Sequence, residues 1–243
     1  AIVGNVALFL KKKYKIPVVY TYHTRYEQYL YYVKPLERIE RYTGVIQKYM
    51  GYFCKRCDML LAPTPGMRDY LMAQNFGEGV PVKVLPTGIP EECFFPDMDR
   101  AAEIRRSYKG DKDYLFVTVS RLAREKNLLF QLEGLALLKE KLARYGKTFR
   151  HMMIGEGPQR QELMERVREL GLEDTVVFPG TVPNSEMKNY QSAADLFLFT
   201  SKSETQGIVV LEAMAAGNPV AAVDATGVRD VVEDHKNGCL TRE

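Results

Sequence analysis

Two glutamates, Glu204 and Glu212, flank the start of a predicted helix in the stretch SETQGIVVLEAMAAGNPV, residues 203–220. Gly207 lies between them, and the free backbone N–H groups at a helix start bind anions. A carboxylate suits paired hydroxyls because each oxygen accepts a hydrogen bond. One glutamate could therefore hold a hexose and the other a ribose, with phosphate at the helix N-terminus between them. The alternative is that Glu204 only caps the helix and complements its dipole. Glu212 fits that explanation less well, because it interrupts an apolar run.

A basic loop, SRLAREKN at residues 120–127, directly follows a predicted strand. Arg121 and Lys126 flank the loop, and Asn127 is predicted to cap the next helix. Two cations beside a helix N-terminus would bind a diphosphate. A solvated basic loop is an equal alternative on the local sequence.

A second loop, GEGPQ at residues 155–159, opens like a dinucleotide-binding fingerprint, but Arg160 stands in place of the third glycine. We interpret Gly155 as part of a tight backbone turn near a nucleotide. The mismatch also argues against a nicotinamide-dependent dehydrogenase. That alternative requires the protein to bind NAD.

Alternating elements must position these motifs. Strands are predicted at 114–120, 149–157, 175–181, 195–201 and 219–225, and helices at 127–142, 158–171, 185–194 and 207–217. Continuous apolar strands that alternate with helices indicate a parallel sheet covered on both faces. The sequence predicts a doubly wound α/β domain, in which ligands bind beyond the carboxyl ends of the strands. All three motifs fall there.

The first part of the chain has fewer elements. Strands are predicted at 17–23, 58–64 and 82–88, a long helix across 36–57, and a linker at 86–99. We expect an N-terminal domain over 1–88 and a nucleotide-binding domain over 89–243. Three strands are few for a doubly wound sheet, the chain starts without Met, and it stops soon after a turn. We therefore expect a piece of a longer protein, truncated in both domains.

Composition sets further bounds. The 46% hydrophobic and 27% charged residues are typical of a globular protein, and no apolar run approaches a membrane span. Residues 1–110 carry 17 Lys and Arg against 11 Asp and Glu, which suits an anionic partner or surface. Four cysteines are too few for a disulfide framework, which predicts a cytoplasmic location. No nucleic-acid partner is expected.

Two motifs resemble metal or redox sites. Cys54 and Cys57 have suitable spacing, but they lie in a helical pattern without a second ligand pair, and buried thiols are the better interpretation. Asp97 and Asp99 fall in the predicted linker and not at a strand end. No metal and no other cofactor is expected.

The motifs SRLAREKN, GEGP, FPGTV, AADLFLFTS, EAMAAGNPV and NGCL span nearly all of 114–240 in order. Together they resemble family 4 of the retaining glycosyltransferases of GT-B fold, in which two Rossmann-like domains face a cleft. The resemblance implies a nucleotide-sugar donor; UDP-glucose is the expected one, and the base and the sugar of the donor stay open. It assigns the diphosphate to Arg121 and Lys126, the hexose hydroxyls to Glu204 and the ribose to Glu212. It also implies that backbone N–H groups of Thr205, Gln206 and Gly207 support the sugar and phosphates.

A narrower resemblance lies in TYHTRYEQYLYYV, residues 21–33, and in ETQG, residues 204–207. Both resemble the branch that glucosylates diacylglycerol at membrane surfaces. His23 matches the family position beside the transferred sugar, although lone histidines are more often structural. Tyr26 and Glu27 are expected on the acceptor side, and helix packing explains them nearly as well.

Two basic segments bear on a membrane partner. In residues 36–57, apolar side chains recur at helical spacing beside several Lys and Arg: Ile39, Ile46, Tyr49, Met50 and Phe53. LFLKKKYK, residues 8–15, adds three consecutive lysines. Such segments can lie on anionic lipid, here the inner face of the plasma membrane. The alternative for each is a helix that faces the core with a solvated basic side.

The expected reaction moves a hexose from a nucleoside diphosphate to an acceptor hydroxyl. Cations and a helix dipole would stabilise the departing diphosphate, and the resemblance implies retention. The acceptor is a lipid such as diacylglycerol, or a cell-wall or capsular saccharide. A donor-binding module without turnover is the alternative from another class.

Overall fold

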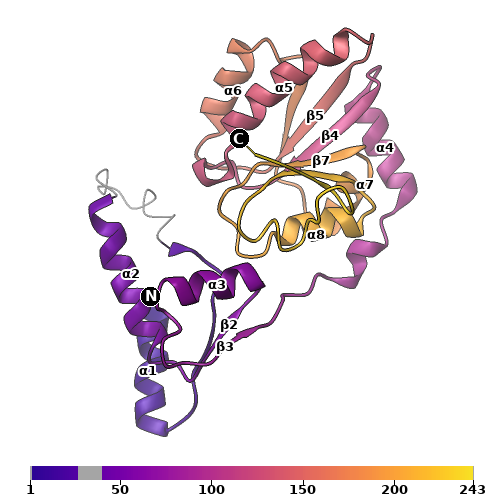
Figure 1. Ribbon diagram of the computed structural model, residues 1–243. Coiled ribbons are helices and arrows are strands. Elements are labelled where there is room, and N and C mark those ends of the chain that lie inside the picture. Colours follow the sequence, from indigo (N-terminus) through magenta and orange to yellow (C-terminus); the bar gives the residue numbers. More distant parts are fainter. Residues whose placement is uncertain (1, 27–39, 243) are drawn as a thin grey trace. The chain divides into compact units, whose positions relative to one another are not determined.

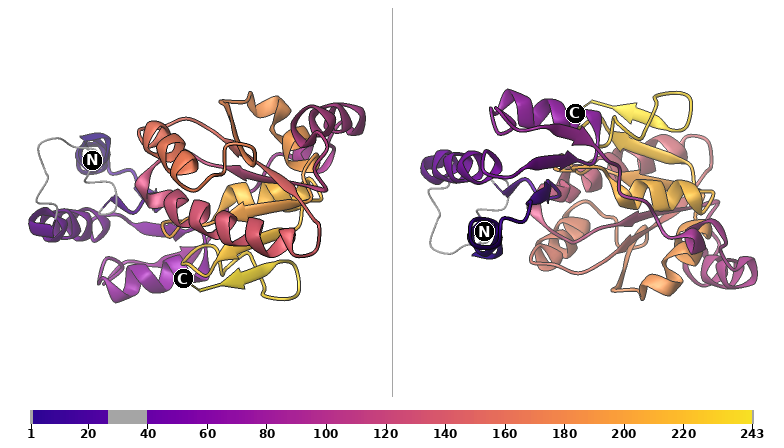
Figure 2. Two further views of the ribbon diagram at one scale, coloured as in Figure 1. Left: turned by 90° about the horizontal axis from the view of Figure 1, so that it is seen from above. Right: turned by 90° about the horizontal axis from the view of Figure 1, so that it is seen from below.

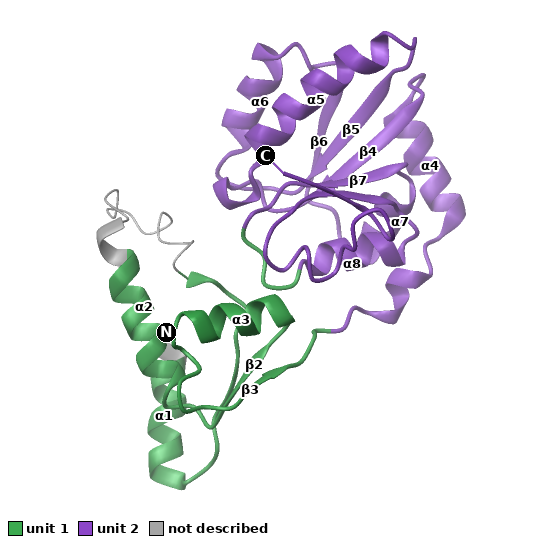
Figure 3. Cartoon of the chain, viewed as in Figure 1, with its two compact units in different colours: residues 1–87, 203–206 green, residues 88–202, 207–243 purple. Residues whose placement is uncertain are grey.

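The computed structural model of the chain describes residues 2–26 and 40–242. The described part divides into two compact units, shown in different colours in Figure 3. The first unit consists of Ala1–Thr87 and Ser203–Gln206, and the second of Gly88–Lys202 and Gly207–Glu243. The segment Ser203–Gln206 lies within the sequence predicted for the second domain, yet it packs with the first unit. Thr205 and Gln206 form hydrogen bonds with residues of that unit.

A parallel sheet in the order β1-β2-β3 forms the first unit among the described residues. Its strands are β1 Val19–Thr21, β2 Met59–Ala62 and β3 Val82–Val84, and its helices are α1 Ile2–Tyr14, α2 Glu40–Cys54 and α3 Pro65–Ala73. Leu60 and Ala62 are buried, while the residues that alternate with them are partly exposed. The buried side packs with Phe53 and Phe76 in the core of this unit. The period of two thus sets which side chains of β2 enter that core.

Helix α3 was not among the predicted elements, although its start has a clear signal. The Thr64 hydroxyl accepts a hydrogen bond from the Met67 N–H at 3.1 Å, and Pro65 occupies the first turn. A threonine cap followed by proline is a favoured helix start, because the cap satisfies a free N–H and proline needs none.

A parallel sheet in the order β6-β5-β4-β7-β8-β9 forms the second unit among the described residues. Its strands are β4 Tyr114–Val119, β5 Phe149–Ile154, β6 Val176–Gly180, β7 Leu196–Phe199, β8 Val220–Val223 and β9 Cys239–Thr241. Its helices are α4 Met98–Lys109, α5 Leu128–Ala143, α6 Arg160–Glu169, α7 Asn184–Ser192 and α8 Ile208–Ala215, with short 3-10 turns η3 Glu91–Phe94 and η4 Arg124–Lys126.

Helices cover both faces of the second sheet, α5 and α6 on one and α4, α7 and α8 on the other (Figure 1 and Figure 2). Leu115 and Val117 of β4 enter a core with Val210 of α8. Phe116, which lies between them in sequence, enters a second core with Leu132 of α5. This strand is buried on both faces, and the predicted doubly wound sheet is confirmed.

The predicted linker over residues 86–99 is only partly correct. It contains η3 and runs into the start of α4. The Asp97 carboxylate accepts hydrogen bonds from the N–H groups of Asp99 and Arg100 at 3.1 and 3.0 Å, so it caps α4. The Asp-x-Asp sequence therefore serves a helix start.

The predicted apolar face of residues 36–57 corresponds to α2 in the described residues, while Ile39 lies outside them. Met50 and Phe53 are buried in the core of the first unit, and Ile46 and Tyr49 pack against it. The membrane interpretation of this face is therefore wrong, because the face is occupied by the protein's own core. No helix in residues 2–26 and 40–242 is long and apolar enough to cross a membrane.

Candidate functional site

The three predicted motifs follow three strands of the second sheet. Residues 120–127 follow β4, residues 155–159 follow β5, and the segment from Thr200 follows β7. Because β4 pairs in parallel with both β5 and β7, all three segments leave the sheet at its carboxyl edge. This edge is where open α/β sheets bind ligands.

The loops after β4 and β5 are packed backbone to backbone. A Cβ atom at Gly155 would lie 1.9 Å from the Ser120 carbonyl oxygen, and one at Gly157 would lie 2.3 Å from that of Leu122. Gly155 also has a φ of +131°, which side chains disfavour. The Leu122 N–H donates to the Glu156 carbonyl at 3.0 Å. The glycines are therefore required by the contact between the loops, which agrees with the predicted tight turn, while its nearness to a nucleotide stays a prediction.

An ion pair fixes the side chain of Arg121 at one end. Its Nη2 lies 2.6 Å from Glu125 Oε1. The Glu125 side chain is 3% exposed, whereas that of Arg121 is 46% exposed. The buried carboxylate thus orients a guanidinium that still reaches solvent. Glu125 is not among the predicted site residues, although its spacing of four residues from Arg121 signals such a pair.

Lys126 ends η4 in the same loop, and Asn127 follows it. Asn127 occupies the N-cap position of α5, but its backbone is left-handed with a φ of 56°, and among the described residues its side chain makes no capping hydrogen bond. The predicted cap is therefore wrong in its chemistry. The left-handed backbone instead turns the chain from η4 into α5, and keeps Lys126 beside the helix start.

The segment Ser203–Gln206 is bound to the first unit by its side chains and backbone. Thr205 Oγ1 donates to the His23 carbonyl at 3.1 Å, and the Thr64 hydroxyl donates to the Thr205 carbonyl at 3.3 Å. The buried Gln206 amide accepts from the Thr87 N–H at 2.9 Å and donates to the Thr87 carbonyl at 2.8 Å. The structure thus brings Thr205 and His23 together. The Gln206 side chain is hydrogen-bonded to the Thr87 backbone.

Helix α8 starts directly after Gly207, whose φ is +72°. Gly207 has no side chain with which to cap the helix, and the alternative that Glu204 is the cap stays open. Glu212 lies in the second turn and is half-buried, and its burial raises the pKa of the carboxyl. It is close enough to Cys93, which lies in η3, to help raise the pKa of that thiol, although burial is the larger cause.

The predicted acceptor-side residues lie in the first unit. His23 is exposed and follows β1 by two residues. Tyr26 is 38% exposed and lines a pocket of about 250 Å³. The other lining residues come from α1, the β1 region and α2: Gly4, Ala7, Val18, Val19, Tyr20, Tyr49, Met50 and Phe53. Glu27 lies outside the described residues.

The thiols of Cys54 and Cys57 are both free and buried in the core of the first unit. Burial raises their pKa to about 12 and about 11, respectively. Because the thiolate is the reactive and metal-binding form, these groups are structural, as predicted.

Comparison with known proteins adds the family. The model of glycosyl transferases group 1 matches residues 99–243, and that of glycosyltransferase family 4 matches residues 2–92. The alpha-monoglucosyldiacylglycerol synthase of Streptococcus pneumoniae is 31% identical over 98% of this chain and 53% of its own length. The synthase of that name from Acholeplasma laidlawii is 29% identical over 97% of this chain and 59% of its own length. The chain thus spans about half the length of the curated relatives it matches.

Solved structures agree on the fold. The Anabaena protein HepE in complex with UDP and glucose superposes with a TM-score of 0.79 at 21% identity, over 98% of this chain and 61% of that one. Sucrose-phosphate synthase from Thermosynechococcus elongatus gives a TM-score of 0.79 at 23% identity, over 98% and 58%. The α/β fold with parallel sheets, predicted as the GT-B type, is confirmed. The motif order over 114–240 and the family match over 99–243 coincide, and the chain belongs to the group 1 glycosyl transferases.

Proposed function

We propose that this chain carries the donor site of a retaining hexosyltransferase that uses UDP-glucose. The observation that supports it best is the carboxyl edge of the second sheet. There, an anchored guanidinium (Arg121), a lysine (Lys126) and the start of α8 at Gly207 follow adjacent strands. A diphosphate carries the charge that these groups attract. The UDP and glucose in the HepE complex belong to a protein of the same fold.

The proposed roles follow from the chemistry of each group. Negative charge grows on the departing diphosphate in the transition state. It is stabilised by Arg121, Lys126 and the N–H groups at the start of α8. Glu212 accepts hydrogen bonds from the ribose hydroxyls, and Glu204 from those of the hexose. The turn at Gly155 shapes the loop beside the nucleotide. In this proposal the protein's own cations take the place of a metal.

The proposed acceptor is a lipid hydroxyl, with diacylglycerol as the first candidate. The names of the pneumococcal and Acholeplasma relatives support this choice. His23 and Tyr26 are the proposed acceptor-side residues of the first unit, since His23 is exposed and Tyr26 lines an apolar pocket. A cell-wall or capsular saccharide is the alternative acceptor.

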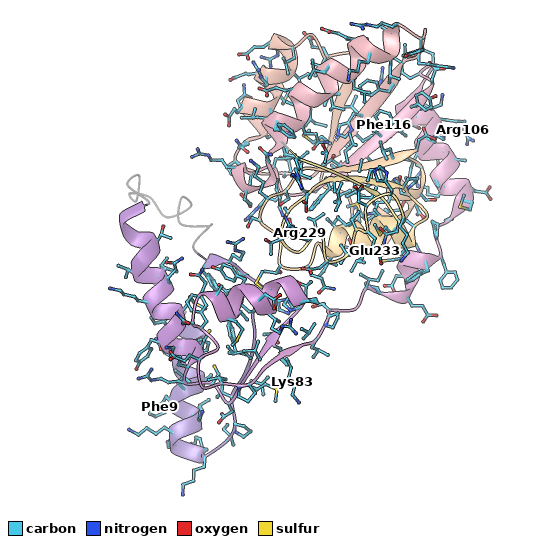
Figure 4. All side chains as sticks on the ribbon, in the orientation of Figure 1. Phe9, Lys83, Arg106, Phe116, Arg229 and Glu233 are labelled. Atoms are coloured by element: carbon cyan, nitrogen blue, oxygen red, sulfur yellow. The ribbon has the colours of Figure 1, made fainter. Side chains whose placement is uncertain are left out.

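The proposed membrane contact is α1, on the inner face of the plasma membrane. Val6, Phe9 and Tyr14 are 52%, 61% and 59% exposed, and Lys12 and Lys13 are exposed beside them. Figure 4 labels Phe9 on this helix, and Lys13 Nζ lies 6.0 Å from its ring centroid. Apolar side chains interleaved with lysines suit an anionic lipid surface.

Calorimetric titration of the chain with UDP-glucose, GDP-mannose and NAD tests the donor proposal. Binding of UDP-glucose alone is the expected result, and tight NAD binding would contradict it. A donor-binding module without turnover is the second candidate, because the chain spans about half the length of its relatives. Transfer of labelled glucose to diacylglycerol or to a saccharide, by the full-length protein and by this chain, separates the two candidates and identifies the acceptor.

A further inference from the structure

Three consecutive residues after β7 bind the backbone of η4. Thr200 Oγ1 donates to the Lys126 carbonyl at 3.0 Å, and Ser201 Oγ donates to the Glu125 carbonyl at 3.3 Å. The Lys202 N–H donates to the same Glu125 carbonyl at 3.4 Å. We call residues 200–202 the clasp. It joins the loop after β4 to the loop after β7, which is the strand next to β4.

The hydroxyl of Thr200 also contacts a buried polar network inside the second unit. It lies 3.3 Å from Oε1 of Gln131, which is 4% exposed. Nε2 of Gln131 lies 2.5 Å from Thr118 Oγ1 and 3.2 Å from His151 Nε2. Burial lowers the pKa of His151 to about 3, so the ring is neutral, and its Nε2 is paired with the Gln131 amide. Thr200 is therefore the point at which a neutral network in the sheet meets the backbone of the basic loop.

We propose that Thr200 is a positioning residue for the diphosphate of the donor, an inference that rests on the proposed donor binding at residues 120–127. The clasp fixes the backbone of Glu125, the carboxylate of Glu125 holds Arg121 at 2.6 Å, and the carbonyl of Lys126 is bound by Thr200 itself. Without the Thr200 hydroxyl, η4 gains freedom, and both cations lose their fixed direction. The two cations must then be ordered when the anion binds, and this entropy cost lowers the affinity.

Three variants test the role of the hydroxyl with little change in shape. Thr200→Val removes the hydroxyl, and Thr200→Ser restores it. Thr118→Val is the matched control, because the Thr118 hydroxyl binds Gln131 and the Leu198 carbonyl, and neither lies in η4. The UDP affinity of the 243-residue chain, measured by calorimetry, is expected to fall roughly three- to tenfold in Thr200→Val. Thr200→Ser and Thr118→Val are expected to stay within about twofold of the parent chain.

Hydrogen exchange of the unliganded chain gives a second measurement that needs no donor. The amides of residues 120–127 are expected to exchange faster in Thr200→Val than in the other two variants. Equal exchange and equal UDP affinity in Thr200→Val and Thr118→Val would overturn the inference. If the parent chain fails to bind UDP while the exchange difference is present, the donor proposal is overturned and the clasp itself is supported.

Discussion

Glu125 and Arg121 lie one helical turn apart in sequence, and their ion pair is buried at the carboxylate and open to solvent at the guanidinium. A cation held in this way has already lost much of its rotational freedom, so it can bind a phosphate without a further ordering cost. The pair supports the proposal that this basic loop is an anion site.

Arg121→Ala should weaken UDP binding by about 1–3 kcal/mol, because a charge-assisted hydrogen bond to the phosphates is lost. Calorimetry measures the effect. Arg106→Ala, which removes an exposed arginine from α4, is the control for net charge and should leave the affinity unchanged. Equal affinities for the two variants would remove Arg121 from the site.

Two glycine substitutions should have opposite effects on the free energy of unfolding. Gly155→Ala places a Cβ against the Ser120 carbonyl at a positive φ and should cost roughly 3 kcal/mol or more. Gly134→Ala lies within α5, where a Cβ would meet no described atom within 4 Å, and should stabilise by up to about 1 kcal/mol. Urea denaturation measures both. A well-folded Gly155→Ala chain would show that the two loops are not packed as described.

Glu212→Gln should raise stability and lower donor affinity together. Burial raises the pKa of the Glu212 carboxyl, so the folded chain binds this proton more tightly than the unfolded chain does. The protonated carboxyl contributes its full share to the free energy of unfolding below the unfolded-chain pKa of 4.5. This contribution is lost as the pH rises through the raised pKa of the folded chain.

The glutamine stays neutral, so Glu212→Gln should melt above the parent chain at pH 7, and the difference should shrink toward pH 4. Thermal melts across this range test the sign, and calorimetry with UDP-glucose tests the loss of binding. Glu140→Gln, at an exposed position on α5, should change neither quantity. A lower melting temperature for Glu212→Gln at pH 7 would contradict the burial argument.

Gln206→Leu should lower the free energy of unfolding by about 1–2 kcal/mol, because the N–H and carbonyl of Thr87 lose both partners. Gln161→Leu is the control. It removes an exposed glutamine that makes one side-chain hydrogen bond to Glu165 on α6. Similar urea midpoints for the two variants would show that the buried amide adds no stability.

Reversing the charge of Lys12 and Lys13 to Glu should abolish most binding to vesicles that contain phosphatidylglycerol, since each basic residue contributes about 1 kcal/mol at such a surface. Co-sedimentation measures the bound fraction. Reversal of Lys141 and Arg144, two exposed cations near the end of α5, changes the net charge equally and should have a smaller effect. Loss of binding in both double variants to the same degree would exclude a specific role for α1.

The alternation of elements in the second unit could be predicted because its signals are local. Phe116 and its neighbour Leu115 enter different cores, so the strand reads as a continuous apolar run, and such runs between helical patterns specify a parallel sheet. The position of the motifs at the carboxyl edge follows from that sheet. The ion pair of Arg121 with Glu125 was also within reach of the sequence, since it depends on a spacing of four residues.

The neighbours of Thr205 could not be predicted in the same way. Its hydroxyl binds the carbonyl of His23, which is 182 positions away in sequence. Every residue has a backbone carbonyl, so the residue type at position 23 gives no signal of this bond. Asn127 shows the other limit. Its residue type favours a cap, but the left-handed backbone that it adopts depends on how η4 meets α5. Packing between distant segments decides both cases.

The grouping of Ser203–Gln206 with the first unit has a consequence for dividing the gene. A cut between Thr87 and Gly88 looks like a clean boundary, because the polypeptide passes there from one unit to the other. A protein expressed from the downstream half would nevertheless keep Gln206 and lose the Thr87 backbone that its buried amide binds on both sides. The two halves are thus not interchangeable modules. A chimaera that exchanges the upstream half for that of a relative must match residue 206 as well, although it lies deep in the other half of the coding sequence.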